Sequence, residues 1–150
     1  MAHRFARRCE SPLDGTPAVR DMVDVIDAAA RSYLFARYPD ARAIQAYREH
    51  HKADIEVAGT VDSEPHFFYG RSTRAWHEEF SIVTQHGLRL DVVDNISLAP
   101  RIAVKPGDVV AVKGQLVPRA GEGIVHDTHH CPGRGWHQGG WIQWHGARYM

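Results

Sequence analysis

Apolar residues recur at steps of three and four positions between residues 16 and 37, which is the spacing of one face of an α-helix. Thr16 offers an N-cap oxygen and Pro17 suits the first helical position, so we expect the helix to begin there. Tyr38-Pro39 ends the pattern, because the residue before a proline avoids the α region. The predicted apolar face consists of Val19, Met22, Val23, Ile26, Ala29, Ala30, Tyr33 and Leu34.

A second, shorter helix is expected from Asp40, which can cap it, to His51. Residues 16–52 therefore form a predicted helical segment, which either packs against the rest of the chain or forms an interface with a second copy. Residues 1–15 are rich in arginine and are broken by Ser-Pro and Asp-Gly pairs, so we expect a flexible basic N-terminus.

From residue 53 the spacing of apolar positions changes to two, which is the spacing of half-buried β-strands. Gly59 is interpreted as a bend in the first strand and Gly114 as a bulge in the fourth. Residues 62–74 are expected to be a loop, and residues 94–100 a short irregular or helical link. Five strands are predicted, at residues 55–61, 76–85, 88–93, 109–117 and 124–128.

Three strands, a short link and two further strands follow one another in the order of an OB-like barrel, which closes to avoid long exposed edges. An SH3-like barrel shares much of this pattern and stays an alternative. The predicted fold class is mainly β with N-terminal helices (α+β), with the barrel and its His/Trp/Gly-rich loop over residues 53–150. Small barrels fill their interiors with side chains, so a ligand site is expected on the barrel face or at its mouth.

Composition narrows the classes of function. The 18 Lys and Arg balance the 18 Asp and Glu, which excludes a basic charge over the whole surface but allows a local basic patch. The two cysteines, Cys9 and Cys131, give no disulfide framework. Without an apolar signal region or a spanning run of about twenty apolar residues, the chain is expected to be soluble and cytoplasmic, with no membrane partner.

The stretch from Gly123 to Trp144 reads GIVHDTHHCPGRGWHQGGWIQW and concentrates residues that carry chemistry. Neutral imidazole is a common metal ligand, and its pKa also suits acid/base work. The strong zinc patterns, HExxH and paired CxxC, are absent from the sequence. We nevertheless expect a divalent transition metal here, with zinc the best candidate; the alternative is that the histidines fix the loop. The predicted metal ligands are His126, His129, His130, His137 and Cys131.

Three blocks of the chain resemble the bacterial family known as domain of unknown function 3465. They are HEEF at 77–80, DNISLAPR at 94–101 and the stretch from His126 to Trp141, within a resemblance that covers about residues 44–149. The family pattern has a histidine where this chain has Asp94 and an acidic residue where it has Cys131. The resemblance implies a small OB-like barrel with a shared site, in which these two residues could still ligate a metal, and it implies no established activity. Many relatives carry a secretion signal.

Several residues carry two interpretations each. His77 is either a structural histidine or a general base, and Arg101 is either solvated or placed to stabilise developing charge. Asp94 and Asn95 either bind a ligand or make a turn through their own side chains. The tryptophans either stack on a ligand or clasp the fold. The predicted catalytic residues are His77, His129, His130 and Arg101, and the predicted ligand-binding residues are Asp94, Asn95, Trp136 and Trp141.

Three hypotheses of different classes follow. The first is a barrel with a histidine-rich, metal-holding site that binds single-stranded nucleic acid or a small ligand. The aromatic run Phe67-Phe68-Tyr69, with Arg71 and Arg74 close by in the sequence, is typical of surfaces on which bases stack. The second is a metal-dependent or histidine-based hydrolase of phosphodiesters. The third is a structural protein that forms a homodimer through its helical segment. The binding barrel is the leading hypothesis, because paired carboxylates typical of many hydrolases are missing.

Overall fold

The computed structural model describes residues 17–131, 133 and 137–150, and the chain divides into two units, 1–32 and 33–150. Helix α1 (Pro17–Arg37) begins at the expected proline, and its final residues belong to the second unit. The predicted cap at Thr16 lies outside the described residues. Neither helix in the described part of the chain is long and apolar enough to cross a membrane.

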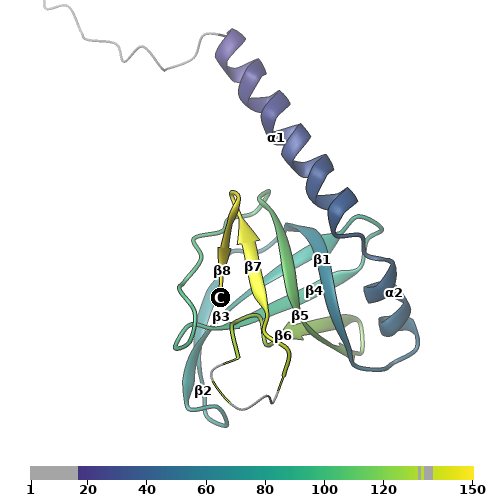
Figure 1. Ribbon diagram of the computed structural model, residues 1–150, viewed down its shortest axis with the longest axis vertical. Coiled ribbons are helices and arrows are strands. Elements are labelled where there is room, and N and C mark those ends of the chain that lie inside the picture. Colours follow the sequence, from purple (N-terminus) through teal and green to yellow (C-terminus); the bar gives the residue numbers. More distant parts are fainter. Residues whose placement is uncertain (1–16, 132, 134–136) are drawn as a thin grey trace, which may run out of the picture. The chain divides into compact units, whose positions relative to one another are not determined.

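The second unit contains a closed barrel of five strands (Figure 1). These strands are β1 (Ala53–Val61), β3 (Ala75–Thr84), β4 (Arg89–Asn95), β5 (Val109–Arg119) and β6 (Glu122–His126). Around the barrel the order is β1-β3-β4-β6-β5, and β5 pairs with β1 to close it. Strands β4 and β6 are parallel, and all the other neighbours are antiparallel. The prediction of two helices followed by a five-stranded barrel is therefore confirmed.

Three further strands correct the predicted loops. Strand β2 (His66–Gly70) lies within the expected loop 62–74 and pairs with the start of β3. Its aromatic residues have high strand propensity, which outweighs the lack of a buried alternating face. Strands β7 (Trp141–Trp144) and β8 (Ala147–Tyr149) form a hairpin that adds to β5, so the end of the histidine-rich stretch is sheet rather than loop.

Gly114 does not form the predicted bulge. Strand β5 pairs with β1 without interruption from Leu116 to Val109. On its other edge β5 changes partner, because Gln115 pairs with His126 of β6 and Lys113 pairs with β7. A Cβ atom at Gly114 would lie 2.5 Å from the carbonyl oxygen of His126. The glycine is needed for close backbone approach where the partner strand changes.

The core fills the barrel and continues to the second helix, α2 (Ala41–Arg48). Ala43 and Ala46 of α2 are buried with the inward residues of the strands. Burying each large aliphatic or aromatic side chain stabilises the fold by about 1.5–3 kcal/mol. The largest fully buried apolar side chains are Phe80, Ile82, Leu90, Ile102, Leu116, Ile142, Val57, Val61, Val92, Val110 and Val112.

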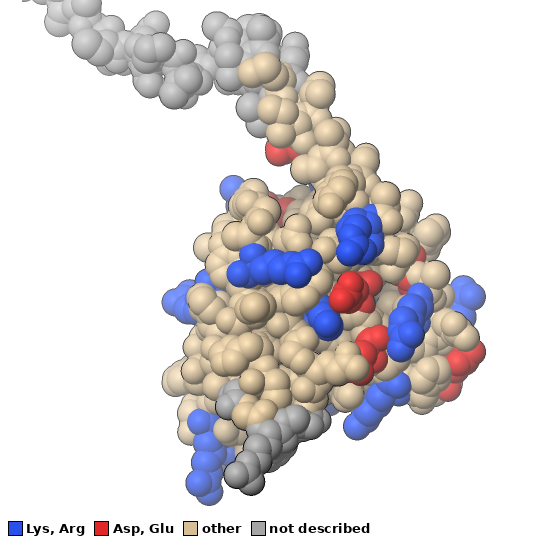
Figure 2. All heavy atoms as spheres, in the orientation of Figure 1, with Lys and Arg blue, Asp and Glu red and all other residues tan. Residues whose placement is uncertain are grey.

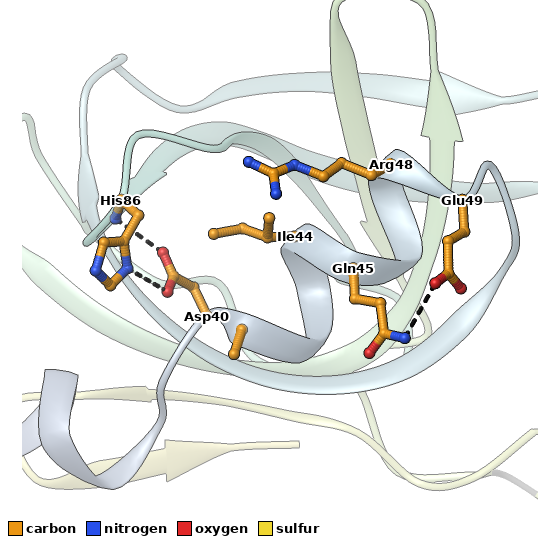
Figure 3. A pocket seen from close by; sticks show the side chains of 7 residues that line it. Asp40, Ile44, Gln45, Arg48, Glu49 and His86 are labelled. Carbon is orange, nitrogen blue, oxygen red and sulfur yellow. Dashed lines mark hydrogen bonds and ion pairs between the residues drawn. The ribbon is translucent and has the colours of Figure 1, made fainter.

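Asp40 precedes α2 but makes no side-chain cap, contrary to the prediction. Its carboxylate instead binds His86 in the β3–β4 turn, at 2.8 Å from the backbone N–H and 2.8 Å from Nδ1 (Figure 3). Burial alone would raise the pKa of Asp40, but hydrogen bonds from Thr84 and His86 outweigh it and lower the pKa. The carboxylate therefore links the start of the helix to the barrel and does not accept a hydrogen bond from the free N–H groups of the first helical turn.

Candidate metal site and pocket

One pocket of about 260 Å³ gathers residues that are far apart in the sequence. One wall comes from β2, β3 and the turn between them, and another from β4. The third comes from the end of β6 and the residues that follow it. The lining residues are Phe68, Gly70, Ser72, Thr73, His77, Val93, Asn95, His126, Asp127 and His129.

Strand register sets the first part of this pocket. Phe68 of β2 pairs with His77 of β3, which pairs with Asn95 of β4, so the three side chains share one face of the sheet. The Phe68 ring stacks on the His77 imidazole with centroids 5.2 Å apart and planes 14° apart. This contact holds His77 in place, only 8% exposed, in the pocket wall.

A second cluster lies beside this wall. One potential ligand atom from each of Asp127, His129 and His137 falls within 4.8 Å of the others. Asp127 has a φ of 58°, a left-handed conformation that aspartate tolerates better than most residues. The turn is braced by Gly140, whose N–H donates to the carbonyl oxygen of His129 at 2.8 Å. Two imidazoles and one carboxylate are therefore close enough together to hold one metal ion.

The same kind of hydrogen bond fixes the tautomer of three imidazoles. Nδ1 of His77 lies 3.1 Å from the carbonyl oxygen of Ala75. Nδ1 of His129 lies 2.8 Å from the carbonyl oxygen of His130, and Nδ1 of His137 lies 2.6 Å from that of Gln138. A carbonyl oxygen only accepts, so Nδ1 carries the proton in each ring. Nε2 is then the ring nitrogen that can offer a lone pair to a metal, which is the arrangement that second-shell partners give to metal-binding histidines.

Burial and neighbouring groups shift the pKa values of His77 and Asp127. Burial lowers the pKa of His77, and the nearby His129 lowers it further. The hydrogen bond to Ala75 raises this pKa but does not outweigh the two other effects, so the ring is neutral at neutral pH. The pKa of Asp127 is lowered, first by its hydrogen bond from His126, whose Nδ1 lies 3.2 Å from the carboxylate. A neutral imidazole and an ionised carboxylate are the forms that bind a cation.

The structure places several predicted residues at this site. His126 and His129 line the pocket, and His137 joins the cluster. Asn95 also lines the pocket, while its Oδ1 accepts from the N–H of Ser97, so it makes the expected turn as well. Asp94 is buried behind the pocket, at 1% exposure, and bonds Thr128. Asp127 was not predicted, although a carboxylate directly between two histidines of one motif is the signal that could have found it.

Other predicted residues lie elsewhere. The Arg101 guanidinium lies 4.0 Å from the ring centroid of Phe67 and does not line the pocket. His130 contributes its carbonyl oxygen to His129, and Cys131 donates to the carbonyl oxygen of Gly133. Trp141 is buried against the Tyr38 ring, as expected of a structural clasp. Trp136 lies outside the described residues.

Comparisons with known proteins give a family and nothing beyond it. A family model described as a protein of unknown function (DUF3465) matches residues 25–150, which confirms the resemblance found in the three sequence blocks. Neither the curated proteins nor the solved structures contain a significant match to this chain.

Proposed function

Because the chain belongs to the DUF3465 family, whose description states no function, we propose a function from its own site: a small barrel that holds one divalent transition metal beside a ligand pocket. The proposed ligands are the Asp127 carboxylate and Nε2 of His129 and His137. The observation that carries the proposal is that both imidazoles keep Nδ1 protonated on a backbone carbonyl while their ligand atoms converge with a carboxylate.

The ligand set favours zinc. Two imidazoles and a carboxylate suit its borderline character, and three protein ligands leave a fourth tetrahedral position for water or another group. Asp127 and His129 also line the pocket, so a metal held by them would border it. A small ligand with one donor atom would bind the metal there and fill the space between Phe68, His77 and Asn95.

Metal analysis tests this proposal. The purified, untagged protein is incubated with zinc, desalted and analysed by mass spectrometry, and we expect about one equivalent per chain. The His129→Ala and His137→Ala variants should lose it. His51→Ala, which removes an exposed histidine of an ion pair with Glu49, serves as the matched control and should retain it. Equal zinc in all four proteins, or none in the parent, would exclude this site.

A second candidate function is hydrolysis, and the position of His77 favours it. His77 is neutral and lines the pocket, and its Nδ1 is held by Ala75, so Nε2 is the nitrogen that could accept a proton from a water molecule in the pocket. A bound zinc ion would lower the pKa of that water toward neutrality. We expect zinc-dependent cleavage of bis(p-nitrophenyl) phosphate, reduced about 10²- to 10⁴-fold in His77→Gln without loss of zinc. No cleavage by the zinc-loaded parent would leave metal-dependent binding as the function.

A further inference from the structure

Three aromatic side chains lie exposed on the hairpin of β2 and β3. Phe67, Tyr69 and Trp76 are 40%, 50% and 53% exposed. Successive strand residues point to opposite faces, so these three share the face opposite to Phe68 and His77, which line the pocket. Large exposed rings gathered on one surface indicate a contact with a partner. We call Phe67, Tyr69, Trp76 and the adjoining Arg101 the aromatic surface.

The backbone holds this surface in a fixed arrangement. Tyr69 and Trp76 are directly paired across the strands, with ring centroids 5.7 Å apart in an edge-to-face orientation. The backbone N–H of Trp76 donates to Oγ of Ser97, and the backbone carbonyl of Trp76 accepts from the N–H of Ile96. Arg101 follows this turn in the chain and lies over Phe67. The rings are therefore presented by paired strands and not by a free loop.

The segments that build the aromatic surface are basic, although the whole chain is balanced. Residues 65–77 and 95–107 contain Arg71, Arg74, Arg101 and Lys105 and no Asp or Glu. Figure 2 shows basic and no acidic side chains at the lower left, where Figure 1 places β2. Glu78, the next residue on this face of β3, is 1% exposed and accepts from the N–H of Ile102. A negatively charged partner is therefore favoured.

We propose that the aromatic surface binds single-stranded nucleic acid, with bases stacked on Tyr69, on Trp76 and on the Arg101 guanidinium that covers Phe67, and with phosphates close to the arginines. A base offers a planar face to an aromatic ring only when it is not stacked in a duplex. Stacking together with cations is the combination that binds single strands without reading sequence. This surface lies on the other face of the hairpin from the metal site, so binding needs no metal.

Fluorescence anisotropy with a fluorescein-labelled oligothymidylate of about ten nucleotides, in buffer with EDTA, tests the proposal. We expect the parent to bind and Trp76→Ala to bind about 5- to 100-fold more weakly. Trp76→Phe keeps a ring and should restore most of the affinity. Arg101→Gln should reduce the slope of log Kd against log salt by about 0.7. Tyr33→Ala, at an exposed tyrosine of α1, is the matched control and should bind like the parent.

Circular dichroism verifies that each variant is folded, and Tyr69→Ala replaces Trp76→Ala if the latter unfolds. Absence of an anisotropy change with the parent would overturn the proposal, as would parent-like binding by a folded Trp76→Ala. Unlabelled oligothymidylate should displace the labelled strand better than an unlabelled DNA duplex of the same length does, and equal competition by the two would overturn the proposal, because charge alone would then explain binding. The EDTA makes the result independent of the zinc measurement, so the two proposals fail separately.

Discussion

The hydroxyl of Thr128 donates a hydrogen bond of 2.8 Å to Oδ1 of Asp94, and both residues are almost completely buried. The other carboxylate oxygen, Oδ2, has no hydrogen-bond partner among the described residues. Burial raises the pKa of Asp94, and the Thr128 hydrogen bond only partly opposes this effect. Since Thr128 stands between Asp127 and His129, this bond fixes the turn that carries two proposed metal ligands.

We predict that Thr128→Val destabilises the protein by about 1–3 kcal/mol, because the buried Oδ1 of Asp94 then loses its hydrogen bond from the Thr128 hydroxyl. Zinc affinity should also fall about 10- to 100-fold, which is typical when a supporting residue of a metal site is removed. Thr128→Ser keeps the hydroxyl, so its stability and its zinc affinity should both be close to those of the parent. Urea denaturation and competition with a zinc chelator measure the two effects. Unchanged zinc affinity in a folded Thr128→Val would show that the bond only stabilises the fold.

Two neighbouring glycines provide a matched pair. A Cβ at Gly140 would collide with the carbonyl oxygens of Asp127 and Lys113, whereas at Gly139 the nearest atom is 3.7 Å away. Gly140→Ala should therefore displace the turn at Asp127, destabilise the protein by about 1–3 kcal/mol and lose zinc. Gly139→Ala should have little effect on either measurement. Similar melting temperatures and zinc contents for the two variants would contradict this account of the turn.

Glu78 should make stability depend on pH. Burial raises its pKa, and nearby Asp94 raises it further, against the hydrogen bond from Ile102 and the charge of Arg101. The folded state therefore holds a proton that the unfolded state has released, so stability falls as pH rises from the usual glutamate pKa through the raised value. Glu78→Gln should reduce this loss and leave the part that comes from Asp94, whose pKa burial also raises. Parallel pH profiles of urea unfolding for the parent and Glu78→Gln would show that Glu78 is not its source.

Asp40 should make stability depend on pH in the direction opposite to Glu78. Its pKa is lowered on balance, so its stabilisation is present above the usual aspartate pKa and is lost as pH falls through the lower, folded value. Asp40→Ala should cost about 1.5–3 kcal/mol at neutral pH, because it removes charged hydrogen bonds to His86. Gln45→Ala, which removes an exposed bond to Glu49 nearby, should change stability by less than about 0.5 kcal/mol (Figure 3). Thermal denaturation compares the two variants, and equal losses would refute the role of Asp40.

The alternation of apolar residues predicted the five barrel strands, because their inward side chains share one core. It missed β2, whose alternate residues Phe67 and Tyr69 stay exposed, so the aromatic surface looked like a loop. It also misread Gly114, since a partner change on one edge of a strand leaves no periodic trace in the chain.

Within the site, the sequence identified the stretch but not the set of ligands. His129 and His137 are both in the predicted set, yet only the fold determines that these two converge and that Asp127 joins them. His77 and Phe68 meet through strand register, which sequence spacing alone does not fix. Self-association through the helical segment stays a prediction.

Strand β1 cannot pair with β5 until residues 109–116 have left the ribosome. At about 5–20 residues per second, the emerging β1, β3 and β4 wait several seconds with unpaired edges and an uncovered apolar face. Such edges are templates for pairing with other chains. The order in which the strands are made thus leaves the nascent chain prone to aggregation until the barrel closes.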